Sequence, residues 1–264
     1  VADALFSQGF SAIELSGGCF DPDFDAKLLA LKERGAVLTL HNYVPFWDRA
    51  YVLNLASQSE DIVNTTVNHV RKAIDLSARI DSKYYAFHAG YLIDPRPEEL
   101  GKKISARAFS DRTSALRVFR ERIEGLAEYA KSLGVNLLVE NNVISHNNYQ
   151  EFNGNPLLMC DPDEICTFFN SLNGEVGLLL DFAHLKVSCN TLGIDLEHAF
   201  RTVEPYVRGL HLSDNNGLAD QNLEFDSSAW FLDKLDKFEY RVLEVYEYSD
   251  VTLRKHLDLI DEHL

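Results

Sequence analysis

Side chains that bind metal ions recur at the ends of apolar segments of this chain. Six apolar runs close on, or contain near their end, a histidine, an aspartate or a glutamate: His41, His88, Glu140, Asp181, His211 and Glu244. Imidazole nitrogen and carboxylate oxygen without thiolate form a donor set that suits Mn²⁺, Zn²⁺, Co²⁺ or Mg²⁺. One such residue is more often a helix cap or a satisfied polar group, but six together favour a shared metal site.

Further polar residues lie close to these positions in the sequence. Asp181 and His184 have a D-x-x-H spacing in LLLDFAHLK, which a turn or the first turn of a helix places on one side. Lys186 lies in the same segment, and Asn141 and Asn142 directly follow a glutamate at 140. We interpret the lysine and the asparagine pair as candidate contacts for hydroxyl or phosphate groups of a substrate.

The elements that must position these residues are short apolar strands that alternate with segments of helical period. Expected strands cover 11–16, 36–41, 83–88, 135–140, 176–181, 207–213 and 241–248. Their nearly continuous hydrophobicity is typical of parallel strands buried on both faces. The clearest helix is expected over 112–133, where apolar residues recur at three- and four-residue spacing and Gly134 follows the helix end.

Strand and helix units in this order predict an α/β fold, a (β/α)₈ TIM barrel, over a single domain 1–264. Seven strands are expected within the chain, and we expect the barrel's first strand to be missing from it, upstream of Val1. All strand ends of such a barrel point to one face, where the connecting loops form the active site. The metal-binding side chains would therefore meet there.

Composition excludes several classes of protein. The chain has 264 residues, of which 46% are hydrophobic, enough for a substantial core. Its 25 Lys and Arg against 41 Asp and Glu give a net charge of −16, which makes a nucleic-acid partner unlikely. Four irregularly spaced cysteines favour a reducing, cytoplasmic location. No apolar stretch is long enough to cross a bilayer, so no membrane partner is expected.

An ordered set of segments resembles the xylose-isomerase-like barrel superfamily over essentially the whole chain. The segments are IELSGG, LHNYVPF, YYAFHAG, LLVENN, LLLDFAHLKVS, GLHLSDNNGLAD and LEVY. The superfamily holds sugar and sugar-phosphate isomerases and epimerases, together with the endonuclease IV class of abasic-site nucleases. Resemblance to the isomerases implies that one divalent metal is held by four residues: Glu140, Asp181, His211 and Glu244.

The same resemblance implies roles in the reaction. Glu140 and Glu244 would move the proton at the carbon next to the substrate carbonyl, and His184 would contact the substrate. Some ketose 3-epimerases carry an arginine a few residues after the metal histidine, whereas this chain has SDNNG at 213–217. Substrate positioning is therefore expected to differ from theirs.

Resemblance to the nuclease class concerns other positions. His41 and His88 match histidines of its metal cluster, so they either bind a second metal with Glu140 or contact the substrate. The nucleases also have an aspartate and a histidine separated by one residue. Asp220 fits the aspartate, but Asn222 stands where the histidine would be, which puts a third metal in doubt.

The sequence thus predicts a divalent-metal-dependent sugar or sugar-phosphate isomerase or epimerase of carbohydrate metabolism. Its partner would be a small-molecule sugar or sugar phosphate, and a homodimer is one expected assembly because barrel isomerases commonly pair. One alternative is an endonuclease IV-like abasic-site nuclease or phosphodiesterase. Another is a non-catalytic metal-binding barrel.

Overall fold

The computed structural model describes residues 1–100 and 102–264. Two compact units make up the described chain, one of residues 1–139 with 170–176 and the other of residues 140–169 with 177–264. The single domain expected from the sequence stays a prediction.

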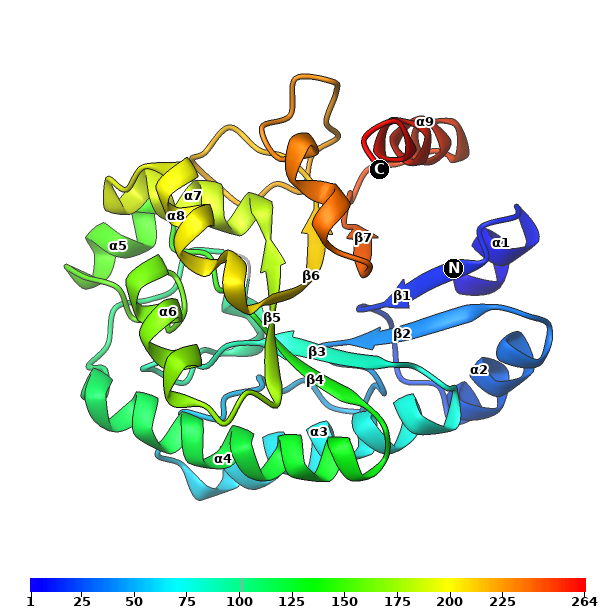
Figure 1. Ribbon diagram of the computed structural model, residues 1–264. Coiled ribbons are helices and arrows are strands. Elements are labelled where there is room, and N and C mark those ends of the chain that lie inside the picture. Colours follow the sequence, from blue (N-terminus) through cyan, green and yellow to red (C-terminus); the bar gives the residue numbers. More distant parts are fainter. Residues whose placement is uncertain (101) are drawn as a thin grey trace. The chain divides into compact units, whose positions relative to one another are not determined.

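The first unit contains strands that follow one another in the sheet in chain order. They are β1 (Ala12–Leu15), β2 (Val37–His41), β3 (Tyr84–His88) and most of β4 (Asn136–Glu140). The first three pair in parallel, with Ile13 opposite Leu38 and His41 opposite Ala86. The helices of this unit are α1 (Ala2–Ser7), α2 (Phe24–Glu33), α3 (Glu60–Arg79) and α4 (Arg112–Ser132). The two long helices, α3 and α4, lie side by side (Figure 1).

The second unit repeats the pattern with parallel strands, which are most of β5 (Val176–Asp181), β6 (Val207–Leu212) and β7 (Arg241–Leu243). Its helices are α5 (His146–Phe152), most of α6 (Pro162–Ser171), α7 (Phe182–Leu192), α8 (Leu196–Val203) and α9 (Asp250–Asp261). The register places Asp181 directly opposite His211, and His211 opposite Val242. Two predicted metal ligands are therefore neighbours across the sheet.

Helix α4 shows how local sequence sets these elements. The Asp111 side chain accepts a hydrogen bond from the backbone N–H of Ser114 at 2.9 Å and so caps the first turn. Buried Phe119 and Ile123 lie on its apolar face. Gly134 follows the helix with φ +75°, a conformation that favours glycine. The helix predicted over 112–133 is confirmed.

The strand predictions agree with the structure except at the last strand. The first six expected strands are observed to within one residue at each end. The seventh, expected over 241–248, ends at Leu243. Beyond that point the backbone N–H of Tyr246 donates to Asn222 O in the preceding loop, so it does not continue the pairing with β6.

Parallel strands in chain order, most of them followed by helices, are the repeat of a TIM barrel, as predicted. The described residues contain seven strands. None of the described helices is both long and apolar enough to cross a membrane.

Close packing around β6 gives a prediction for stability. A Cβ added at Gly209 would lie 2.4 Å from Tyr240 Cδ1, whereas one added at Gly125 in α4 meets nothing within 4 Å. We expect Gly209→Ala to lower the free energy of unfolding by about 1–3 kcal/mol through overpacking. Gly125→Ala should raise it by about 1 kcal/mol through helix propensity. Urea denaturation measures both, and a Gly209→Ala protein as stable as the wild type would contradict the packing argument.

Candidate metal centre

Four potential ligands converge at the carboxyl ends of strands in the second unit. Glu140 and Asp181 are the last residues of β4 and β5, His211 is the penultimate residue of β6, and Glu244 directly follows β7. One donor atom from each lies within 4.8 Å of those of the others. The structure thus brings together the four residues predicted to hold a metal.

The imidazole of His211 lies among the three carboxylates. Its Nδ1 is 2.7 Å from Glu244 Oε2, 3.2 Å from Glu140 Oε1 and 3.9 Å from Asp181 Oδ2. The side chains of His211, Glu140 and Asp181 are fully buried, and that of Glu244 is 17% exposed. Three buried carboxylates repel one another unless a proton or a cation lies between them.

Asp181 tests whether this site suits a divalent cation. Its Oδ1 accepts a hydrogen bond from the backbone N–H of His184 at 2.6 Å and caps helix α7. Its Oδ2 is buried and accepts no hydrogen bond from any described residue. Burial raises the pKa of Asp181, so a nearby positive charge is needed to keep this carboxyl ionised. This carboxylate, the two other carboxylates and the imidazole together form a donor set that fits a divalent cation.

Asn141 fixes the position of Asp181. Its side-chain Oδ1 accepts from the backbone N–H of Asp181 at 2.8 Å, and its Nδ2 donates to Asp181 O at 3.1 Å. The sequence suggested that Asn141 and Asn142 contact the substrate, but the structure gives the Asn141 side chain this supporting position. Asn142 Nδ2 donates to Leu158 O at 2.9 Å, and its predicted substrate contact stays a prediction.

His184 lies beside the cluster, as its spacing from Asp181 predicted. Its Nδ1 donates to Asn141 O at 2.9 Å, and its Nε2 is 3.3 Å from Asp220 Oδ2. Burial lowers the pKa of His184, but the carboxylates of Asp181 and Asp220 outweigh burial and raise the pKa well above its ordinary value. The two carboxylates therefore favour the protonated form of the ring, which lies between a carbonyl and a carboxylate.

Lys186 makes its contacts with the loop after β6. Its Nζ lies 2.5 Å from Asp214 Oδ1 and donates to Asn215 O at 2.6 Å. The charge of the lysine is thus balanced within the protein. Its predicted contact with a substrate stays a prediction.

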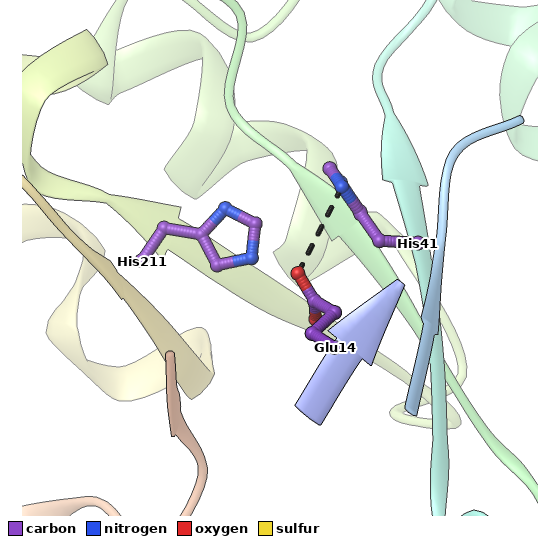
Figure 2. Close-up of side chains that lie close together, drawn as sticks. All are labelled: Glu14, His41 and His211. Atoms are coloured by element: carbon purple, nitrogen blue, oxygen red, sulfur yellow. Dashed lines mark ion pairs between the residues drawn. The ribbon is translucent and has the colours of Figure 1, made fainter. Parts of the chain in front are cut away.

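His41 and His88 belong to the first unit, where they end β2 and β3. Their ring centroids are 5.7 Å apart, and Asn42 Oδ1 accepts a hydrogen bond from the His88 backbone N–H at 2.9 Å. Figure 2 shows Glu14 beside His41, with Oε1 3.9 Å from Nδ1. Sequence reasoning missed Glu14, although IELS is another strand with an acid near its end. The predicted second-metal or substrate role of the two histidines stays a prediction.

A family model described as xylose isomerase-like TIM barrel matches residues 2–262. The match covers nearly the whole chain and includes all the residues of the candidate metal centre. It confirms the family resemblance and the fold class inferred from the sequence.

Individual relatives are distant. The uncharacterized protein MJ1311 of Methanocaldococcus jannaschii is 24% identical over 215 residues, which are 80% of this chain and 64% of that protein. The chain thus spans just under two thirds of the length of this curated relative. Among solved structures, a D-tagatose 3-epimerase-like protein has a TM-score of 0.72 and 20% identity, with 98% of this chain and 93% of that chain covered. The TTHB071 protein from Thermus thermophilus, soaked with ZnCl₂, has a TM-score of 0.63 and 22% identity, with 99% and 94% covered.

Asp181 gives a prediction for metal binding with a matched control. Asp181 and Asp195 both cap a helix, and each accepts a hydrogen bond from the backbone N–H three residues later. An asparagine oxygen also caps helices, so Asp181→Asn removes a charged ligand and keeps the cap. We expect Asp181→Asn to lower affinity for Mn²⁺ or Zn²⁺ at least tenfold in calorimetric titration, and Asp195→Asn to leave it unchanged. Equal affinities for wild type and Asp181→Asn would remove this residue from the ligand set.

Proposed function

Because the chain belongs to the xylose isomerase-like TIM barrel family, we propose that it is a divalent-metal-dependent isomerase or epimerase. Its substrate would be a sugar or sugar phosphate. The observation that carries the proposal is that Glu140 and Glu244 both lie within 3.2 Å of one imidazole, in a buried four-residue cluster. Fold likeness to a D-tagatose 3-epimerase-like protein supports the choice of a sugar.

The cation would be held by a set of four side chains: Glu140, Asp181, His211 and Glu244. When bound, a divalent ion supplies an electrophile that stabilises negative charge on the substrate's carbonyl oxygen. A donor set of oxygens and one nitrogen suits Mn²⁺, Zn²⁺, Co²⁺ and Mg²⁺ and does not select one of these ions.

Proton transfer falls to the two glutamates. Removal of a proton next to a carbonyl requires a base within hydrogen-bond reach of that carbon, and carboxylates perform this role in proteins. We propose that one of Glu140 and Glu244 removes the proton and the other returns it, since they reach the cluster from different strands, β4 and β7. Return of the proton to the opposite face of the same carbon gives an epimer, and its delivery to the adjacent carbon gives an aldose or ketose isomer.

His184 would assist as a positively charged hydrogen-bond donor. With Nδ1–H donated to Asn141 O, the remaining Nε2–H lies on the side of Asp220. A substrate oxygen bound next to Asp220 could share this N–H, and a protonated ring could stabilise negative charge that develops on that oxygen. This assignment follows the substrate contact expected from the sequence.

Charge supports a sugar over a nucleic acid. The chain carries −16 overall, and the loop after β6 holds three of its carboxylates, at Asp214, Asp220 and Glu224. A polyanion would be repelled by such a surface, whereas a hydroxylated small molecule would not. A cytoplasmic location is part of the proposal, and the four cysteines, all free, agree with a reducing compartment.

Isotope exchange tests the two glutamates. We expect Glu140→Gln and Glu244→Gln each to slow deuterium exchange from solvent into the C–H next to the carbonyl by about 10²–10⁴-fold, because each removes a proton-transfer group. A panel of ketoses that includes D-tagatose and D-fructose is incubated in D₂O with the Mn²⁺-loaded protein. The protein is then removed, and NMR of the sugars measures the exchange.

Glu224→Gln is the matched control, because Glu224 is exposed in the loop after β6. The Glu224→Gln protein should catalyse deuterium exchange at the wild-type rate. Full exchange in either Glu140→Gln or Glu244→Gln would rule out the proton-transfer roles.

A further inference from the structure

The loop after β6 folds back beside the metal centre of the second unit. Backbone hydrogen bonds join Asp214 and Leu223 in both directions, at 3.0 and 2.8 Å. The N–H of Tyr246, two residues beyond Glu244, donates to Asn222 O at 3.1 Å. Residues 220–223 are therefore held between the segments that follow His211 and Glu244.

Two polar side chains of this region are buried without hydrogen bonds. The Asn222 residue is 1% exposed, and neither its amide nitrogen nor its amide oxygen has a hydrogen-bond partner among the described residues. Ser213 is 0% exposed, and its hydroxyl likewise has none. Buried polar groups in native proteins are rarely left without a hydrogen-bond partner, because burial removes their hydrogen bonds to water and nothing replaces them. A ligand that supplies the missing partners would explain both.

Neighbouring contacts place these groups at the candidate site. Asn222 lies two residues after Asp220, whose Oδ2 is 3.3 Å from His184 Nε2. Ser213 lies two residues after His211, directly beyond the end of β6 at Leu212, and alternate side chains of a strand point to the same side. His211 belongs to the cluster of candidate ligands, so continuation of the strand direction by one residue would place the Ser213 hydroxyl on the side of that cluster.

The side chains of Asn222 and Ser213 are uncharged, and the nearby cation of Lys186 is already paired with a carboxylate. Lys186 Nζ lies 2.5 Å from Asp214 Oδ1, so its charge is compensated by the protein. The remaining side chains around the centre include the carboxylates of Asp220 and Glu244. With Glu140 and Asp181 they make four carboxylates, which exceed the charge of one divalent ion even when His184 is protonated. A phosphate placed there would therefore meet net negative charge, whereas a hydroxyl would meet hydrogen-bonding partners.

We propose that Asn222 and Ser213 form a hydroxyl-binding subsite that selects an unphosphorylated sugar. A carboxamide offers two donors and an acceptor, and a serine hydroxyl offers one donor and acceptor lone pairs, so both match alcohols that donate and accept at once. The inference rests on the proposed isomerase or epimerase function and narrows its substrate to a neutral polyol.

The test compares Asn222→Ala and Ser213→Ala with Asn216→Ala, an exposed amide in the same loop. Ligand-observed NMR gives Kd for D-tagatose, D-fructose and D-fructose 6-phosphate, deuterium exchange gives KM and kcat, and thermal unfolding gives Tm without sugar. We expect Asn222→Ala and Ser213→Ala to raise Kd and KM for the neutral ketoses about tenfold, the effect of one lost hydrogen bond. Ser213→Ala should leave Tm within a degree or two of wild type, since no hydrogen bond within the protein is lost. Asn222→Ala should lower Tm by several degrees, because asparagine tolerates the φ of +45° at this position better than alanine does. Asn216→Ala should leave Kd and KM unchanged, because the Asn216 side chain, among the described residues, accepts only from the Leu218 N–H within the loop.

The outcomes separate this inference from the function on which it rests. Unchanged Kd and KM in Asn222→Ala and Ser213→Ala overturn the subsite, as does a large fall in Tm with wild-type affinity, which indicates a structural role. Tighter binding of D-fructose 6-phosphate than of the neutral ketoses overturns the selection of a neutral sugar. Binding that depends on Asn222, with no exchange in wild type, upholds the subsite and contradicts the proposed reaction. Binding of none of these sugars contradicts both.

Discussion

The mutual repulsion of three carboxylates is the constraint on which the second unit depends. Glu140 and Asp181 are fully buried, Glu244 is nearly so, and all three surround the imidazole of His211. Such a group is stable only when a proton or a cation offsets the repulsion. The parallel strands set the residues at one edge, and the surrounding hydrogen bonds keep them there without neutralising them. The centre is therefore prepared for a cation by electrostatics as well as by geometry.

The side chain of Asp181 combines a helix cap with a place in the candidate metal cluster. A D-x-x-H spacing suggests either a helix cap or two site residues on one side of the chain. In the structure both hold, because Oδ1 caps α7 through the His184 N–H while Oδ2 faces His211. The same helix start places the His184 ring beside Asn141 O. Local sequence thus sets the distance between ligand and imidazole before any tertiary packing is considered.

Strand positions and the polar residues at the strand ends could be predicted from the sequence because both follow from local patterns. The choice of four of these residues as candidate metal ligands came from the resemblance to the isomerases. A short apolar run marks a buried parallel strand, and a polar residue at its end marks the site face, as Glu140 and His211 show. Contacts between distant segments could not be predicted in this way. Asn141 reaches the backbone of Asp181 across 40 residues, and Lys186 meets Asp214 across 28. The early end of β7 likewise depends on a hydrogen bond between Tyr246 and the loop at Asn222.

The unequal exposure of the two glutamates has an isotopic consequence. Glu140 is sealed from water, whereas Glu244, just past a strand of only three residues, keeps 17% of its side-chain surface open. A proton on Glu140 would exchange with solvent more slowly than one on Glu244. In an epimerisation each direction receives its incoming hydrogen from the glutamate opposite the one that removed the proton, so the direction in which Glu244 delivers would take up solvent hydrogen faster than the reverse direction.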